Sequence, residues 1–161
     1  IQDGKVYAME AIGDILLENN DTEAINWYEK AAAYDVYAQI KLGDIYFEGT
    51  LIKRDTQKAY DYYLDVIESN ADISDTKAAY VMETIADICL ENEDAQAIDW
   101  YEKAAPYDSY AQIKLGEIYY YGTFGKKDMK KAHYYFTQVA KNEEAMEMNR
   151  EYAEEMLDII D

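Results

Sequence analysis

The chain has 161 residues, half of them hydrophobic, and only one proline and seven glycines interrupt it. This length is enough to bury a real core, and the composition favours long regular elements over a loop-rich fold. Fifteen basic and 34 acidic side chains give a formal net charge of −19 at pH 7, which disfavours nucleic acid as a partner because such a surface repels phosphate groups.

The remaining composition narrows the class of protein further. A single cysteine, Cys89, leaves no basis for a disulfide framework or a multi-cysteine zinc site. No apolar run approaches the roughly 20 residues of a membrane span, and no basic start followed by an apolar stretch indicates a secretion signal. The chain begins at Ile1, so the compartment stays unknown: the cytoplasm is favoured, and export is open if a leader precedes Ile1.

The chain contains an internal duplication. Residues 12–50 and 85–123 align without a gap at a shift of 73, and 28 of the 39 aligned positions are identical. Each copy holds two smaller units, since Ile12-Gly13-Asp14-Ile15 resembles Leu42-Gly43-Asp44-Ile45 thirty residues later. A period in the thirties to forties indicates helix–turn–helix repeats, which bury their apolar faces by stacking on one another.

These patterns predict an all-α fold: a right-handed α-solenoid of four helix–turn–helix repeats, in two tandem copies of a 73-residue pair, plus a C-terminal capping helix. The prediction is one domain over 1–161, with repeats at about 5–34, 36–69, 76–106 and 109–141, and a cap at 143–160. Ile12, Leu42, Ile85 and Leu115 are expected in the core. In the cap, one stripe is expected to pack, and it comprises Ala145, Tyr152, Ala153, Met156 and Ile160.

Helix ends are marked by aspartate and glycine. An aspartate precedes each second helix and the first helices of repeats two and four, where its carboxylate can accept from free first-turn amides. These residues are Asp21, Asp55, Asp94 and Asp128, and Asp35 and Asp108. Gly49 and Gly122 are expected to end helices in a left-handed conformation. Gly43 and Gly116 fall in mid-helix, which costs about 1 kcal/mol relative to alanine and predicts a close approach of the partner helix.

A spaced motif recurs along the chain. It reads Ala38-x-x-x-Leu42-Gly43-x-x-Tyr46-x-x-Gly49, then Asp55-x-x-Lys58-Ala59-x-x-Tyr62-Tyr63, and it returns from Ala111 to Tyr135. This resembles the Sel1-like repeat family, relatives of the tetratricopeptide repeats. The resemblance implies an α-solenoid that acts as an adaptor or scaffold, commonly in bacteria, and it names no partner. Repeats one and three depart from the pattern through a shortened turn between their helices.

In tetratricopeptide-like solenoids the first helix of each repeat generally lines the concave face, which suggests a binding surface. The same positions of the four first helices carry tyrosine and, seven residues later, an acid, so both point the same way. Large aromatic residues lie further along. The predicted partner-binding residues are Tyr7, Asp14, Tyr37, Asp44, Phe47, Tyr80, Asp87, Tyr110, Glu117 and Tyr120. Tyrosine is favoured in binding surfaces. The alternative is that the tyrosines pack between neighbouring helices and the acids are merely solvated.

Two further features carry weaker hypotheses. A cluster of basic residues at the last turn between helices forms either a small anion site or a solvated turn. It comprises Lys126, Lys127, Lys130 and Lys131, and Lys53, Arg54 and Lys58 occupy the matching place in repeat two. His133 aligns with Ile25, Tyr60 and Ile98, which predicts a partly packed histidine rather than a catalytic one. Cys89 aligns with Leu16 and is expected to be a small buried hydrophobe.

The leading interpretation is a protein–protein interaction module that binds a basic or amphipathic protein or peptide in a concave groove lined by tyrosines and acids. The alternative is an acidic immunity or inhibitor protein that neutralises a basic toxin or enzyme. No enzyme activity, cofactor, metal, nucleic acid or membrane is expected, because the sequence has no glycine-rich phosphate loop and no metal-ligand spacing. The oligomeric state is left open.

Overall fold

The computed structural model describes residues 2–69 and 73–160, and within those ranges the chain is helical with no strand. The chain forms two compact units, residues 1–72 and 73–161. The all-α prediction is confirmed. The first unit contains α1 (Gln2–Glu18), α2 (Glu23–Ala32), α3 (Val36–Glu48) and α4 (Thr56–Glu68). The second contains α5 (Asp75–Glu91), α6 (Gln96–Ala104), α7 (Ser109–Tyr121), α8 (Met129–Lys141) and α9 (Glu147–Ile160).

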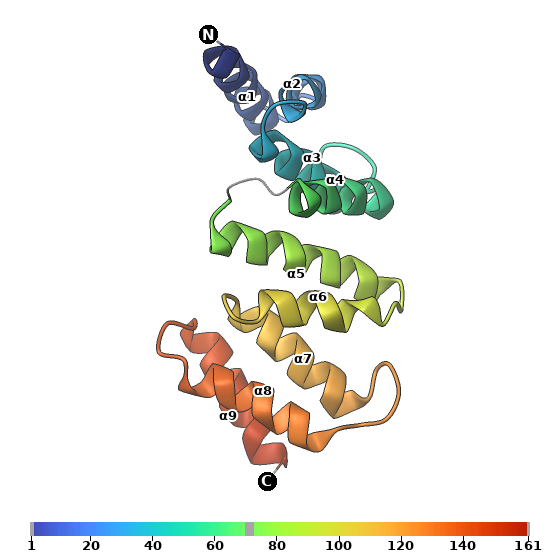
Figure 1. Cartoon of the computed structure of the whole chain (residues 1–161), viewed down its shortest axis with the longest axis vertical. Coiled ribbons are helices and arrows are strands. Elements are labelled where there is room, and N and C mark those ends of the chain that lie inside the picture. The colour runs from blue at the N-terminus through green and yellow to red at the C-terminus, as the bar shows by residue number, and fades with distance from the viewer. Residues whose placement is uncertain (1, 70–72, 161) are drawn as a thin grey trace. The chain divides into compact units, whose positions relative to one another are not determined.

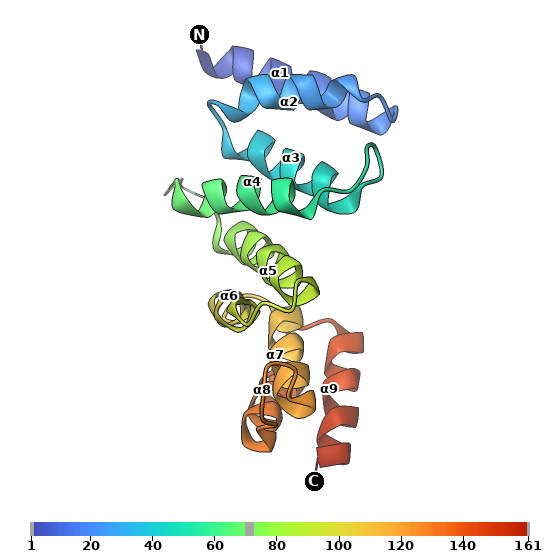
Figure 2. The ribbon, with the colours of Figure 1, turned by 90° about the vertical axis from the view of Figure 1, so that its right-hand side faces the viewer.

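In the first unit, consecutive helices pair as hairpins. Helices α1 and α2 lie side by side in both views, and so do α3 and α4 (Figures 1 and 2). Helix α2 also packs against α3, so the two hairpins share one apolar core. Its buried members are Val6 of α1, Ala24, Tyr28 and Ala31 of α2, and Ala38, Leu42 and Ile45 of α3. Burial of these faces stabilises helices that would be marginal alone.

In the second unit, α5 pairs with α6, α7 pairs with α8, and α9 packs against α8 and α7 (Figure 2). Helix α9 follows a turn, so Ala145 enters the core from that turn while Ala153 and Met156 enter it from the helix. The expected cap stripe packs here, because Tyr152 and Ile160 also contact this core. The other side of α9 is rich in exposed glutamates, as a terminal element of a solenoid requires.

The predicted helix ends are confirmed with one shift. Asp35, Asp55, Asp108 and Asp128 are N-caps whose carboxylates accept from first-turn amides, for example from the Tyr37 amide at 2.7 Å. Asp21 and Asp94 lie one residue before the helix cap. Their carboxylates accept from the amides of Glu23 and Gln96, each at 2.9 Å. Gly49 and Gly122 end α3 and α7 with φ of 68° and 72°, a conformation that other residues rarely adopt.

Glycines in the first helices allow an aromatic ring to lie directly on the backbone. A Cβ on Gly43 would lie 2.6 Å from the Tyr63 ring, and one on Gly116 would lie 2.8 Å from the Phe136 ring. Gly13 faces Tyr28 in the same way, at 2.8 Å. The predicted close approach is therefore confirmed.

Two packing predictions are wrong and one is confirmed. Leu42, Ile85 and Leu115 are fully buried, but Ile12 is 37% exposed because no helix among the described residues covers that side of α1.

His133 is exposed on α8, and its ring Nδ1 lies 3.4 Å from the Thr137 hydroxyl, so the apolar character of the aligned positions did not predict its packing. Cys89 is buried as predicted, and burial raises the pKa of its thiol to about 11.

Candidate functional site

The acids of the first helices hold tyrosines from the second helices. Asp14 accepts from the Tyr28 hydroxyl at 2.7 Å and Asp44 accepts from the Tyr63 hydroxyl at 2.7 Å. Asp87 accepts from the Tyr101 hydroxyl in the same way. Burial and this hydrogen bond raise the pKa of Tyr28 far above its ordinary value of 10.0, so its hydroxyl stays a donor. Each aspartate therefore contributes to the fold as well as to the surface charge.

The fourth repeat replaces this bond. Phe136 occupies the place of the buried tyrosines and carries no hydroxyl. Glu117, the acid of this repeat, accepts instead from the Tyr152 hydroxyl of α9 at 2.8 Å. Lys114 also donates to Glu117 at 3.2 Å. The acid at this position thus bonds the first helix to the second helix in three repeats. In the fourth repeat it bonds the first helix to the capping helix α9.

Tyr37 connects the two repeats of the first unit. Its hydroxyl donates to Asp14 at 3.0 Å, so Asp14 accepts from two tyrosines, one on α2 and one on α3. Burial and this bond raise the pKa of Tyr37 to about 12. Tyr110 is the matching residue of the second unit, and burial followed by the charge of Asp87 raises its pKa. Tyr37 and Tyr110 are half-buried, so they serve partly as packing between helices.

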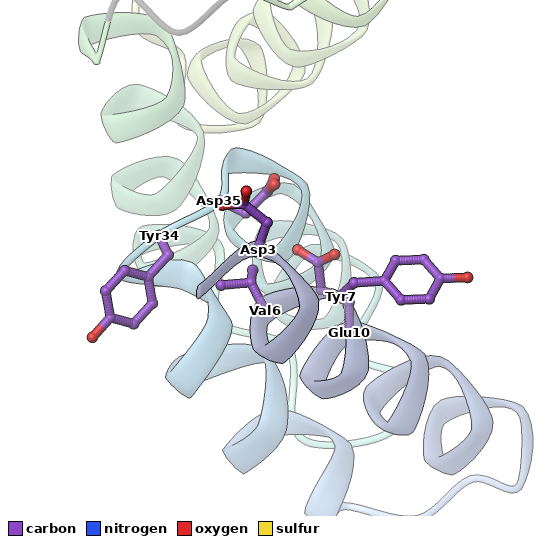
Figure 3. A pocket seen from close by; sticks show the side chains of 6 residues that line it. All are labelled: Asp3, Val6, Tyr7, Glu10, Tyr34 and Asp35. Carbon is purple, nitrogen blue, oxygen red and sulfur yellow. The ribbon is translucent and has the colours of Figure 1, made fainter. Parts of the chain in front are cut away.

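The first unit gathers two carboxylates of α1 and the capping carboxylate of α3 in one cleft. Asp3, Glu10 and Asp35 line a cleft of about 550 Å³ together with Val6, Tyr7 and Tyr34. Figure 3 shows the carboxylates between the two tyrosine rings, which extend away to opposite sides. Burial, then Asp35 and Asp14, raise the pKa of Glu10. Oε1 of Glu10 is shielded from solvent and accepts no hydrogen bond from the described residues. We call Glu10, Asp14, Asp35 and Tyr37 the first acidic site.

The second unit repeats this arrangement at a shift of 73. We call Glu83, Asp87, Asp108 and Tyr110 the second acidic site. Burial raises the pKa of Glu83 to about 8, and the neighbouring charge and hydrogen bond of Asp108 add to the effect. Asp108 is held in place by the amides of Tyr110 and Ala111, at 3.0 and 3.3 Å. A half-buried carboxylate beside a fixed one favours either a proton or a cationic group between them.

Exposed tyrosines flank both acidic sites. Tyr7 is 74% exposed and Tyr80, its equivalent, is 42% exposed. Each carries its ring one helical turn from the glutamate of its site, Glu10 or Glu83. The four predicted tyrosines are therefore of two kinds: Tyr7 and Tyr80 present their rings to solvent, whereas Tyr37 and Tyr110 sit between helices.

Phe47 and Tyr120 belong to a different surface. Arg54 lies over the Phe47 ring at 4.9 Å and donates from Nε to the Phe47 carbonyl at 2.7 Å. Lys127 lies over the Tyr120 ring at 5.6 Å. Lys58 and Lys131 lie over Tyr46 and Tyr119, whose rings stack on Tyr62 and Tyr135. Arg54, Lys58, Lys127 and Lys131 are thus exposed, and each lies over an aromatic ring. Lys53, Arg54 and Lys58 also line one open cleft.

Sequence reasoning did not assign Glu10, Asp35, Glu83 or Asp108 to the site. A signal existed, because the acid between the predicted tyrosine and aspartate occurs in repeats one and three only, and Ile40 and Ile113 replace it elsewhere. The sequence pattern predicts Asp35 and Asp108 as helix caps alone. Only the structure shows that a cap of one repeat lies beside the glutamate of the preceding repeat, since charge coupling between them requires proximity.

Within residues 2–69 and 73–160, no group of three or more His, Cys, Asp or Glu side chains is arranged to hold a metal ion. None of the helices in these ranges combines the length and apolar character that crossing a membrane demands.

The fold resembles solved proteins of known family. A crystal structure of a Sel1 repeat protein from Oxalobacter formigenes is 27% identical in sequence, with a TM-score of 0.67 over 84% of this chain and 58% of that one. A protective antigen of uropathogenic Escherichia coli strains that displays an SLR fold is 22% identical over 97% of this chain and 43% of that one, with a TM-score of 0.44. This chain therefore spans less than two thirds of either protein. No curated protein matches its sequence.

The sequence also matches the family description for the Sel1 repeat in four segments, at residues 9–33, 36–64, 89–105 and 109–143. These segments follow the helical hairpins and together cover more than half of the chain. Proteins of this kind generally act as protein-interaction scaffolds and are generally non-enzymatic. The chain belongs to the Sel1 repeat family.

Proposed function

We propose that this chain is a protein-interaction module in which each of the two acidic sites binds a basic segment of another protein. The observation that carries the proposal is their repetition: Glu10 and Asp35 in one unit, and Glu83 and Asp108 in the other, pair a half-buried glutamate with a helix-capping aspartate. Two neighbouring carboxylates repel each other, and neither can neutralise the other. A lysine or arginine side chain placed between them would relieve this repulsion.

The local charge supports the same partner. In the first unit, Glu10, Asp14, Asp35 and Asp44 surround Tyr37, while Lys41 lies over its ring at 5.4 Å. In the second unit, Glu83, Asp87, Asp108 and Glu117 have Lys114 among them. Carboxylates outnumber lysines fourfold around each site, which speeds encounter with a basic partner and steers its orientation.

The exposed tyrosines add contact area. Tyr7 and Tyr80 each present a large, rigid ring with a polar tip beside an acidic site, which suits the apolar part of an amphipathic segment. Because both rings are exposed, their removal is expected to leave the helices intact. Tyr37 and Tyr110 are poorer choices for such a test, since they contribute to the packing between repeats.

The test is affinity capture with the wild-type chain, followed by binding measurements on the captured protein. Glu10→Gln/Glu83→Gln removes one carboxyl group from each acidic site without touching the acids that hold tyrosines, and it removes one charge from each site when binding is measured above pH 8, the pKa of Glu83 being about 8. Glu154→Gln/Glu155→Gln removes the same charge from the exposed side of α9 and is the matched control. We expect a basic protein to bind wild type and control equally, to bind the site variant about tenfold or more weakly, and to associate more slowly as salt rises.

Two results would contradict the proposal: equal binding by the site variant and the control, or a captured partner whose affinity does not change with salt. Tyr7→Ala/Tyr80→Ala provides a second variant, expected to weaken binding while the helical circular dichroism stays unchanged. If the captured protein is an enzyme or toxin that loses activity when bound, the module acts as an inhibitor of it rather than as an adaptor.

A further inference from the structure

Basic residues gather at two places in this acidic chain. Seven of its 15 lysines and arginines lie in residues 53–58 and 126–131. The two stretches correspond at the shift of 73, and each spans the end of a turn between helices and the start of the next helix, α4 or α8. None of these cations belongs to the acidic sites, so they call for an explanation of their own.

In the first unit these cations line a cleft. Lys53, Arg54 and Lys58 border a space of about 720 Å³, and all three side chains are exposed. Among the described residues that line it, Asp55 alone carries a carboxylate, and this group is engaged as the N-cap of α4, where it accepts from the Lys58 amide at 3.1 Å. The first residues of α4 also line the cleft and add the positive end of a helix dipole. The charge of the cleft is therefore opposite in sign to that of the whole chain.

Aromatic rings hold two of the cations in position. The Arg54 guanidinium lies 4.9 Å from the centre of the Phe47 ring, and its Nε donates to the Phe47 carbonyl at 2.7 Å. The Lys58 ammonium lies 4.9 Å from the centre of the Tyr46 ring, and Tyr46 itself lines the cleft. Such contacts restrict the side chains without cancelling their charge. Less conformational freedom is then lost when an anionic group binds.

The rest of the lining is partly apolar. Ile25 and Ile52 are half-buried and line the cleft together with the buried Tyr46. A simple anion would leave this apolar area uncovered, whereas a peptide with acidic and apolar side chains contacts both kinds of surface. A nucleic acid fits less well, because its long run of phosphates would also face many of the 34 acidic residues of the chain.

We propose that this cleft binds a short acidic segment of another protein. The segment places carboxylates against Lys53, Arg54 and Lys58 and an apolar side chain against Ile25 and Ile52. We call these five residues, with Tyr46, the basic cleft. Complementary charge selects the acidic partner, and the apolar lining selects a peptide among anions.

The second unit has a smaller counterpart. Ile98, Tyr119 and Lys126 match Ile25, Tyr46 and Lys53 in the sequence, and they line a space of about 70 Å³. Lys131 donates to the Tyr119 hydroxyl at 3.0 Å. Because this space is about one tenth of that in the first unit, the proposal concerns the first unit.

The basic cleft is independent of the acidic sites. Asp35 caps the start of α3, and Tyr46 lies about 16 Å further along the helix axis, at 1.5 Å per residue. At physiological salt, charges further apart than about 8 Å are largely screened from each other. Glu10→Gln/Glu83→Gln is therefore expected to leave binding at the basic cleft unchanged, and failure of one proposal does not imply failure of the other.

The probe is the synthetic peptide Glu-Glu-Leu-Glu-Glu, blocked at both ends and titrated into the isotope-labelled whole chain at physiological salt. Binding is followed by the backbone amide shifts of residues 51–58. Lys53→Gln/Lys58→Gln is expected to raise the dissociation constant about fivefold or more, because it removes two exposed ion pairs. Lys5→Gln/Lys141→Gln removes the same charge from exposed positions elsewhere and is expected to bind as wild type does. Lys53→Arg/Lys58→Arg keeps both charges and is expected to retain most of the affinity.

The proposal is overturned if millimolar peptide shifts no amide of residues 51–58, or if the control variant weakens binding as much as Lys53→Gln/Lys58→Gln does. Equal binding of the neutral peptide Gln-Gln-Leu-Gln-Gln would also overturn it, since charge would then not select the ligand. A short oligothymidylate that binds more tightly than the acidic peptide, with the same dependence on Lys53 and Lys58, would assign the cleft to nucleic acid instead. Self-association that sedimentation detects in wild type but not in Lys53→Gln/Lys58→Gln would assign it to a second copy of the chain. Circular dichroism checks that the lysine variants keep the helical fold.

Discussion

Replacing Gly43 by alanine is expected to destabilise the first unit, although alanine is the better helix former. The new Cβ would lie 2.6 Å from Cε1 and 2.8 Å from Cζ of the Tyr63 ring, closer than real Cβ contacts come. The ring is fully buried and its hydroxyl donates to Asp44 at 2.7 Å. It can move away only by straining that bond or by separating α3 from α4.

The magnitude follows from two opposing effects. Alanine gains about 1 kcal/mol over glycine within a helix. Overpacking of a well-filled core costs about 1–3 kcal/mol. The expected net loss is about 1 kcal/mol in the free energy of unfolding, and up to about 2 kcal/mol if the ring cannot adjust. In the third repeat, Ala86 occupies the matching position and Tyr101 still bonds Asp87, which shows that a hairpin built for alanine accommodates it.

Urea denaturation followed by far-ultraviolet circular dichroism measures the effect, with Gly4→Ala as the control. Gly4 also lies in a helix, but a Cβ there would meet nothing within 4 Å, so its replacement is expected to leave stability unchanged or raise it by less than about 1 kcal/mol. Ala86→Gly should cost about 1 kcal/mol by the same helix preference. The reasoning is refuted if Gly43→Ala and Gly4→Ala stabilise the protein equally.

Two further predictions concern the buried polar groups. Tyr63→Phe is expected to cost about 1–2 kcal/mol of unfolding free energy in urea titrations because Asp44 loses the hydrogen bond that the Tyr63 hydroxyl donates. Tyr34→Phe, at a ring that is 62% exposed, should change it little, and equal effects would contradict an anchoring role for Tyr63. Glu83 binds its proton more tightly when folded, so its contribution to stability is present at pH 4–5 and lost as pH rises towards 8. The free energy of unfolding of Glu83→Gln, relative to that of wild type, should therefore rise by about 1–2 kcal/mol between pH 5 and pH 8, allowing for partial solvent screening. If the difference in unfolding free energy between the two proteins stays constant across that range, the pKa shift of Glu83 is refuted.

Much of the fold was predictable because it depends on local patterns. The 73-residue duplication, the helical spacing of Ala38, Leu42 and Ile45, and the glycines Gly49 and Gly122 each reflect a preference that a short segment carries by itself. The fold class and family followed from them. Mid-helix Gly43 likewise predicted the close contact that Tyr63 makes with it.

The site depended on contacts that no single segment contains. The sequence predicted that tyrosines and acids repeat on the first helices, but it did not show that Tyr37 bonds Asp14 of the preceding repeat, or that Asp35 lies beside Glu10. The exposure of Ile12 was equally hidden, since its sequence neighbourhood matches that of the buried Ile85. Burial and charge coupling are set by which helix packs next to a residue, and only the tertiary structure decides that.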